Sequence, residues 1–182
     1  MTPSTTSITR RRLLCGCAGL AALGVLGACA PETERNAAAA PGEADRTTSC
    51  ALDGMLLADY PGPKGQLHYA GAAQVDWYCD TTEVLSVLLR PEQARPLRAA
   101  WVQDMAKADW DRPVGHWIDA RSAFYVLGSR KKGSMGSTAA SFATNAEADA
   151  FAAQHGGKVF AFAAIKPEMV DLSGGALHDT RM

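Results

Sequence analysis

The chain lacks an excess of positive charge. Its 182 residues include 18 lysines and arginines against 19 aspartates and glutamates. Three of the basic residues, Arg10, Arg11 and Arg12, lie before residue 29 in a stretch that has no acid, so the rest of the chain carries a net charge of about −4. A nucleic-acid-binding surface needs a basic footprint to neutralise phosphates. The charge balance therefore argues against nucleic acid as a partner.

Long apolar runs are also missing beyond residue 28, where none approaches the roughly 20 residues that cross a bilayer. Apolar residues still make up 47% of the chain, which excludes a disordered protein of low hydrophobicity. The chain has no nucleophile elbow, phosphate loop, dinucleotide fingerprint, Cys-x-x-Cys or His-Glu-x-x-His motif. We therefore predict a folded protein that is not an enzyme, with proteins or small ions as its partners.

The first 28 residues have the features of an export signal. An apolar run, Leu13–Ala28, follows the three arginines and leads into Leu26-Gly27-Ala28-Cys29, which resembles a bacterial lipobox. Since the cysteine of a lipobox is acylated and becomes the mature N-terminus, we predict lipidation of Cys29 and a chain anchored in the cell envelope, facing the periplasm. Ordinary secretion with cleavage nearby is the alternative, and the arginines fit both a general and a twin-arginine signal.

Few thiols remain once this segment is removed. Of the five cysteines, Cys15 and Cys17 leave with the signal and Cys29 carries the lipid, so only Cys50 and Cys79 are left. In an oxidising periplasm two cysteines ordinarily form a disulfide, which would stabilise the fold by roughly 3 kcal/mol. A function for these thiols has to be weighed against that structural interpretation.

A faint internal repeat indicates two similar halves in the mature chain. Asp80 with Glu83, and Thr144 with Glu147, form capping boxes that satisfy the open amides at a helix start. Helices of about ten residues should therefore begin at both places. Strand-like runs precede and follow each predicted helix, at 66–69, 76–78 and 97–102 in the first half and at 124–127, 139–142 and 158–162 in the second.

The order strand, strand, helix, strand thus occurs twice. We predict an α+β fold of two small modules that share an interface, because a module of about 55 residues buries little surface alone. The predicted layout is a lipoprotein signal peptide at 1–28, the lipidated cysteine and a flexible tether at 29–48, a first α+β module at 49–104, a connector at 105–115, a second α+β module at 116–165 and a C-terminal tail at 166–182.

Soft metal ligands gather near the start of the folded region. Cys50 and Met55 lie five residues apart around Gly54, and Met135 lies between glycines in a polar loop. Thiolate and thioether together favour Cu(I) over zinc, magnesium or calcium. The alternative is that Met55 fills the core and that Met135 folds back onto the body of the protein.

Several motifs resemble the nitrous-oxide reductase accessory lipoproteins of the NosL family, in the same order along the chain. They are Cys50-Ala51-Leu52-Asp53-Gly54-Met55 with the following Leu56–Lys64, Trp77-Tyr78-Cys79-Asp80-Thr81, Trp101–Trp110, Gly133-Ser134-Met135-Gly136 and Ser173–Met182. The resemblance covers nearly all of residues 49–182. It implies a periplasmic Cu(I)-binding chaperone that serves the copper sites of nitrous-oxide reductase together with an ABC-type maturation complex, and a fold related to that of organomercurial lyases.

The resemblance also implies a copper site. Its cysteine-to-methionine segment corresponds to Cys50 and Met55, and its Met-Gly loop corresponds to Met135. Many family members have a second thiol where this chain has Asp53, which leaves the number of ligands open. The chain offers five further candidate donors: His68, Cys79, Met105, His178 and Met182.

Two other functions compete with the copper chaperone. A lyase-like or thiol-redox activity would use Cys50, Cys79 and Asp53, although fold alone does not transfer function. A structural lipoprotein would join Cys50 to Cys79 in a disulfide. The three hypotheses differ in whether the thiols are free, oxidised or bound to copper.

Overall fold

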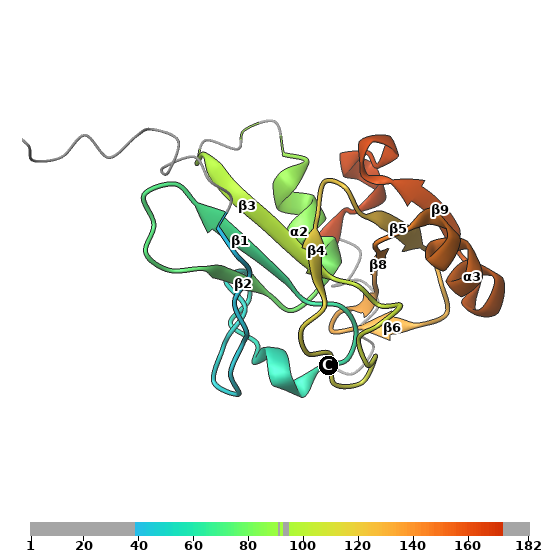
Figure 1. Ribbon diagram of the computed structural model, residues 1–182, viewed down its shortest axis with the longest axis horizontal. Coiled ribbons are helices and arrows are strands. Elements are labelled where there is room, and N and C mark those ends of the chain that lie inside the picture. Colours follow the sequence, from blue (N-terminus) through green and yellow to red (C-terminus); the bar gives the residue numbers. More distant parts are fainter. Residues whose placement is uncertain (1–38, 91, 93–94, 173–182) are drawn as a thin grey trace, which may run out of the picture. The chain divides into compact units, whose positions relative to one another are not determined.

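The computed structural model of the protein describes residues 39–90, 92 and 95–172 (Figure 1). The predicted signal peptide, the lipidation site Cys29 and the tail candidates His178 and Met182 lie outside these residues. Within the described part of the chain, no helix has both the length and the apolar composition that a membrane crossing requires.

The secondary structure follows the predicted order closely. The elements are η1 (Leu57–Asp59), β1 (Gly65–Tyr69), β2 (Asp76–Tyr78), α2 (Thr81–Leu88), β3 (Leu97–Gln103), β4 (Trp117–Asp119), β5 (Phe124–Leu127), β6 (Lys132–Gly133), β7 (Gly136–Ser137), β8 (Ala140–Phe142), α3 (Asn145–His155), β9 (Lys158–Ala161), η2 (Phe162–Ala164) and η3 (Pro167–Met169).

The strands form two main antiparallel sheets that repeat one arrangement. The first sheet has the order β2-β1-β3-β4 and the second has the order β8-β5-β9. In the first sheet, β1 lies between β2 and β3, and in the second sheet β5 lies between β8 and β9. In both sheets, the central strand comes first along the chain, and the strand on its other side follows the helix. Helix α2 packs on the first sheet and α3 on the second, as Figure 1 shows. The predicted α+β class is confirmed, whereas the relation to organomercurial lyases stays a prediction.

Both predicted helix starts are confirmed. Asp80 caps α2 by accepting a hydrogen bond from the backbone of Thr82, and the Glu83 carboxylate accepts one from the backbone of Asp80. Thr144 and Glu147 make the same reciprocal pair at the start of α3. These side chains satisfy amides that the first turn of a helix leaves open.

The structure adds features that the sequence pattern did not indicate. Strand β4 extends the first sheet, and a short hairpin of β6 and β7 is inserted between β5 and β8. Contacts with the first sheet begin before Ser49, since the Trp101 indole donates to the carbonyl of Ala39 at 2.9 Å and Gly42 pairs with the Gln66 side chain.

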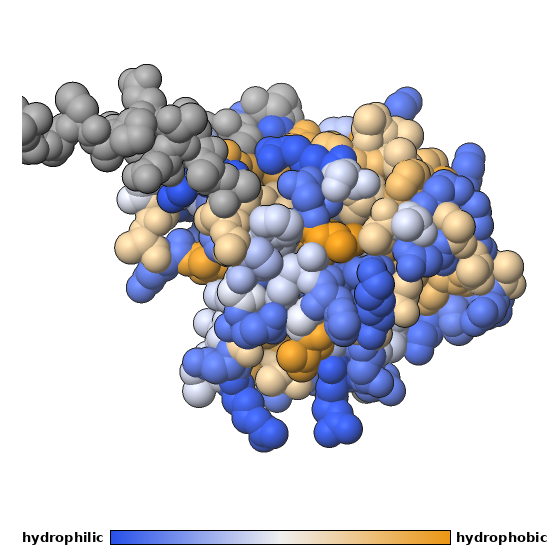
Figure 2. Space-filling view, viewed as in Figure 1, coloured by the Kyte–Doolittle hydropathy of each residue, from blue (hydrophilic) through white to orange (hydrophobic). Residues whose placement is uncertain are grey.

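One hydrophobic core spans both halves. Leu67 and Val84 of the first half share it with Tyr125 of the second half, and Val170 closes it near the end of the described chain. Both thiols belong to this core. Figure 2 shows one face of the molecule, covered mostly by hydrophilic residues with small separate hydrophobic patches. The exposed large hydrophobic residues of the described chain are Leu52, Leu56, Val114 and Met135.

Candidate metal centre

The first sulfur lies in a tight loop at residues 49–56. Ser49 and Leu56 form an isolated antiparallel bridge, and the Cys50 amide donates to the Met55 carbonyl at 2.8 Å. Gly54 turns the chain with a φ of 77°, a backbone conformation that side chains with a Cβ rarely adopt. The Asp53 carboxylate accepts a hydrogen bond from the Met55 amide at 3.0 Å, which holds the acid inside the turn.

The second sulfur lies at the junction of β2 and α2. Cys79 follows the last residue of β2 and directly precedes Asp80, the N-cap of α2. Glu83 follows in the first turn of the helix, four residues after Cys79. The side chains of both Cys79 and Glu83 are completely buried. The capping box therefore fixes the Glu83 carboxylate beside the thiol.

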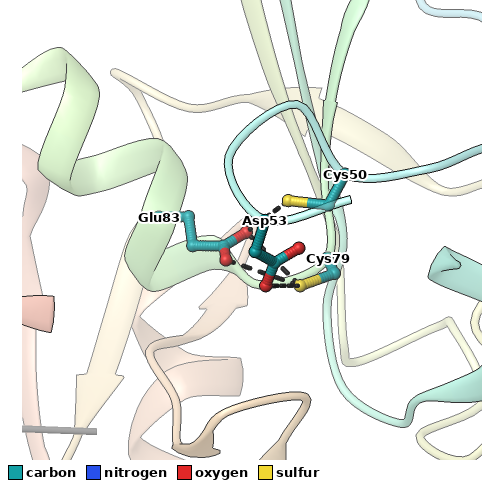
Figure 3. Close-up of side chains that lie close together, drawn as sticks. All are labelled: Cys50, Asp53, Cys79 and Glu83. Atoms are coloured by element: carbon teal, nitrogen blue, oxygen red, sulfur yellow. Dashed lines mark hydrogen bonds between the residues drawn. The ribbon is translucent and has the colours of Figure 1, made fainter. Parts of the chain in front are cut away.

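These two segments bring four potential ligands together (Figure 3). One ligand atom from each of Cys50, Asp53, Cys79 and Glu83 lies within 4.8 Å of the others. Cys50 Sγ is 3.3 Å from Glu83 Oε2, and Cys79 Sγ is 3.5 Å from each Glu83 oxygen and 3.9 Å from Asp53 Oδ2. Both cysteines are free thiols, so the disulfide of the structural hypothesis is not present in the structure.

The two thiols have opposite electrostatic properties. A hydrogen bond from the Cys79 thiol to the Cys50 sulfur lowers the pKa of Cys50 to about 6, against the opposing effect of burial. The same hydrogen bond, together with burial, raises the pKa of Cys79. Burial raises the pKa of Glu83 to about 8, helped by the nearby Cys50 sulfur. At neutral pH, the pair therefore offers one ready thiolate and one thiol that a metal must deprotonate.

A buried lysine lies behind the thiols. Lys64 is only 4% exposed, and its Nζ donates to the carbonyl oxygens of Pro61 and Cys79 at 3.0 Å each. Burial lowers the pKa of Lys64, whereas the negative charge that Cys79 and Asp80 carry when they are ionised opposes that shift. The ammonium group thus fixes the backbone of Cys79 and places a cationic group next to the site.

The two predicted thioether ligands lie on segments next to this cluster, Met55 in the 49–56 loop and Met135 in the β6–β7 turn. Met55 is half-buried and packs against the core that contains both thiols. Met135 is 38% exposed in the turn of the β6–β7 hairpin. Its neighbour Ser134 has a buried hydroxyl that faces the Cys79 thiol and lowers the pKa of that thiol. The turn that carries Met135 therefore reaches the edge of the site.

Two secondary candidates are not brought to the cluster. His68 lies on β1, with its Nε2 2.9 Å from the Gln66 side-chain oxygen, and it is not one of the four grouped ligands. Met105 is buried in a separate core cluster with Phe142. Of the secondary candidates in the described chain, only Cys79 joins Cys50.

Sequence reasoning missed Asp53 and Glu83 as possible ligands. In the sequence, Asp53 marks a departure from the family pattern and a residue of a rival activity, and Glu83 indicates only a capping box. The available signal was the capping box, because its glutamate reaches back to the N-cap and so lies beside the residue that precedes the cap.

The donor set is chemically mixed. Two sulfurs and nearby thioethers suit Cu(I), a soft ion that accepts few ligands. Cysteine and carboxylate side chains together are also ligands that zinc accepts. The geometry therefore gives a group of side chains that could hold a metal ion, and sulfur is the part of it that favours copper.

Comparison with known proteins places the chain in a family. A family model described as NosL matches residues 41–170. The copper-binding lipoprotein NosL of Stutzerimonas stutzeri is 37% identical over 165 residues, which are 88% of this chain and 85% of that protein. The protein of the same name from Achromobacter cycloclastes is 39% identical over 120 residues, covering 64% of this chain and 62% of that protein.

The fold agrees with this relationship. The crystal structure of the copper chaperone NosL from Shewanella denitrificans is similar with a TM-score of 0.66 at 38% identity, over 72% of this chain and 98% of that one. The residues that the family model matches, 41–170, include both sheets and the group of side chains between residues 50 and 83. The chain therefore belongs to the NosL family.

Proposed function

We propose that the chain is a membrane-anchored periplasmic metallochaperone that binds Cu(I) and delivers it for assembly of the copper sites of nitrous-oxide reductase. The observation that carries this proposal is the pair of free, buried thiols with two carboxylates within 4.8 Å. The names of the relatives, copper-binding lipoprotein and copper chaperone, support it.

The proposed copper ligands are Cys50 and Cys79, with Met135 as a thioether at the exposed edge and Met55 as a further donor. Sulfur ligands suit Cu(I) because both the ion and the ligands are soft. Glu83 is protonated at neutral pH because its pKa is raised to about 8, and it lies close enough to donate a hydrogen bond to the Cys50 thiolate. Asp53 lies close enough to accept one from the Cys79 thiol. We assign both acids to orienting the sulfurs. Outer residues of this kind typically tune metal affinity.

In this proposal, Cu(I) can be transferred to a recipient because only two or three ligands hold it. Cys50 is the group that an incoming Cu(I) meets as a thiolate, since its pKa is lowered to about 6. Cys79 must lose its proton to bind, since its pKa is raised. A two- or three-coordinate ion leaves room for a ligand from the recipient to bind before the old ligands leave.

The partners follow from the family resemblance. We propose nitrous-oxide reductase as the recipient and an ABC-type maturation complex as part of the same assembly, with the lipid on Cys29 holding the chain at the membrane. The chain acts as a carrier and not as an enzyme in this proposal. Its fold supplies a site from which the ion can leave.

Competition with a Cu(I) chelator under anaerobic conditions tests this function. We expect one Cu(I) per chain and a large loss of affinity in the Cys50→Ser and Cys79→Ser variants. Met105→Leu is the matched control, because Met105 lies in the separate core cluster and a Met to Leu exchange conserves volume. Wild-type binding no tighter than that of a Cys50→Ser, Met135→Leu double variant would remove the site from consideration.

The same titration repeated with Zn(II) separates the two metals that the donor set could accept. We expect Cu(I) to displace Zn(II), because the thiolate and thioether donors prefer the softer ion. Thiol counting before and after copper loading distinguishes the rivals. A thiol-redox protein would consume both thiols in the presence of an oxidised substrate and would not require copper.

A further inference from the structure

The β6–β7 hairpin that carries Met135 belongs to the second half of the chain but is fastened to the first half. Thr138 Oγ1 donates a hydrogen bond to Asp80 Oδ1 at 2.9 Å, and the Ala139 amide donates to Thr82 Oγ1 at 3.2 Å. Both acceptors lie in the first turn of α2 or at its cap, directly after Cys79. The hairpin is therefore tied to the same few residues that position a thiol.

Close backbone packing accompanies these bonds. A Cβ atom added to Gly133 would collide with the Asp80 carboxylate, and one added to Gly62 would lie 2.9 Å from the Cα of Gly133. Only glycine allows the hairpin to approach this closely. The two glycines thus let Gly133 rest on Asp80, while Ser134 faces the Cys79 thiol.

Asp80 has two structural roles at this point. Its Oδ1 accepts from the Thr82 amide at 2.8 Å as the helix cap, and it accepts from the Thr138 hydroxyl as well. Asp80 and Thr138 are 1% and 4% exposed, so water does not replace a lost bond easily. A contact of this kind fixes the distance between the helix start and the hairpin.

We propose that Thr138, acting through Asp80, is the positioning residue that holds Met135 at the thiol pair, so that the metal site is completed by a residue from the second half of the chain. This inference rests on the proposed copper-binding function. A two-residue strand pair is too short to be stable alone, and methionine has three flexible side-chain bonds. Without the tie to Asp80, the thioether would no longer be held where the thiols need it.

The test compares two variants that each remove a buried hydroxyl hydrogen bond between the halves. Thr138→Val conserves shape and removes the bond to Asp80. Ser141→Ala removes the bond from Ser141 Oγ to the Gln103 carbonyl, which is 2.6 Å long and does not involve the hairpin. Both variants are also made in the Met135→Leu background, and Cu(I) affinity is measured by chelator competition for all four, for Met135→Leu alone and for wild type.

We expect Thr138→Val to lower Cu(I) affinity by up to about tenfold, as is typical for residues behind a metal ligand. Ser141→Ala should leave the affinity unchanged. In the Met135→Leu background, Thr138→Val should have no further effect. X-ray absorption at the copper edge should show one sulfur fewer in Thr138→Val than in wild type or Ser141→Ala.

Two results would overturn the inference. One is an equal loss of affinity on Thr138→Val with and without Met135, since the effect would then come from general destabilisation. The other is an unchanged affinity and sulfur count in Thr138→Val, which would mean that the tie does not position the ligand.

Hydrogen exchange of the metal-free protein separates this inference from the proposed function. Exchange of amides 132–137 should rise in Thr138→Val and not in Ser141→Ala. If wild type binds no Cu(I) and this contrast is still seen, the proposed function fails while the tie itself stands. If exchange rises equally in both variants, the hydrogen bond from Thr138 to Asp80 does not position the hairpin, whatever the copper titration shows.

Discussion

The two halves of the chain share a fold but differ in what they bury. Each has a central strand flanked by two others and a helix that begins with a capping box. In the first half, the cap glutamate Glu83 is completely buried beside Cys79, whereas Glu147 in the second half is half-buried. The residue before the N-cap is Cys79 in one helix and Ala143 in the other.

This difference distinguishes the features that stabilise the fold from those that make a candidate metal centre. A capping box stabilises both helix starts in the same way, so its presence does not indicate a function. The first half becomes a candidate metal centre because a thiol precedes the cap and because the loop of Cys50 covers it. Among the described residues, the second half has no such group, and the segment after its β6–β7 hairpin is bonded to the first half through Thr138 and Asp80.

The largest effect is expected when the first half loses the thiolate that distinguishes it. Cys50→Ser replaces a soft thiolate by a hydroxyl of similar size, so we expect Cu(I) affinity to fall by about a thousandfold while the fold survives. In a denitrifying host that relies on this chain, the exported nitrous-oxide reductase should then be poor in copper when external copper is limiting.

The control for that experiment is Cys29→Ala, which should remove the lipid and leave copper binding intact. Chelator competition and the copper content of the purified reductase are the measurements. Fully loaded, active reductase from the Cys50→Ser strain at low copper would contradict the proposed role.

A matched pair of substitutions tests the two cap glutamates. Glu83→Gln and Glu147→Gln both keep a capping box, so neither helix should be lost. We expect Glu83→Gln alone to lower Cu(I) affinity, by about tenfold to a hundredfold, since only Glu83 lies next to the thiols. Equal copper affinity in the two variants would show that Glu83 is only a cap.

The same pair should differ in the pH dependence of stability. Because burial raises the pKa of Glu83 to about 8 in the folded protein, the unfolded chain releases this proton first as pH rises. The contribution of Glu83 to stability is therefore present below its unfolded pKa of about 4.3 and is lost as pH rises through 8. Glu83→Gln should become more stable relative to wild type across this range, as measured by chemical denaturation, and Glu147→Gln should not.

A smaller effect is expected at the thioether. Met135→Leu should lower Cu(I) affinity by about tenfold and change the free energy of unfolding by less than about 0.5 kcal/mol, because Met135 is exposed. Met105→Leu should do the reverse, costing up to about 1.5 kcal/mol of stability with copper affinity unchanged. The same copper affinity in both variants would remove Met135 from the ligand set.

The smallest expected signal is the titration of a single proton. Ultraviolet absorbance of the metal-free protein should show one thiolate forming near pH 6, since the pKa of Cys50 is lowered to about 6. The step should be missing in Cys50→Ser. Cys79 should stay protonated through the neutral range, because its pKa is raised. Two thiolates at neutral pH would contradict the asymmetry of the pair.

The elements that sequence predicted well are those with a local cause. Capping boxes mark both helix starts, and alternating apolar runs mark the main strands. The β6–β7 hairpin was missed because its strands have two residues each and hold their place through Thr138 and Asp80, a contact 58 positions apart in the chain. Local patterns do not contain such information.

The candidate site was predicted in part for the same reason. Cys50, Met55 and Met135 could be proposed from residue chemistry and family resemblance. The roles of Asp53 and Glu83 depend on burial and on the approach of the 49–56 loop to α2, which emerge only on folding. The sequence likewise does not show that His68 pairs with Gln66 or that Met105 enters a separate core cluster.

The origin of the sulfur donors in three separate segments has a thermodynamic consequence. An ion bound by the 49–56 loop, the β2–α2 junction and the β6–β7 hairpin would act as a reversible crosslink between regions far apart in the chain. Since such binding favours the folded state, copper at a thousand times its dissociation constant would add about 4 kcal/mol to the stability. The loaded protein would therefore resist proteases better than the empty one, so the lifetime of each chain would report whether it carries an ion.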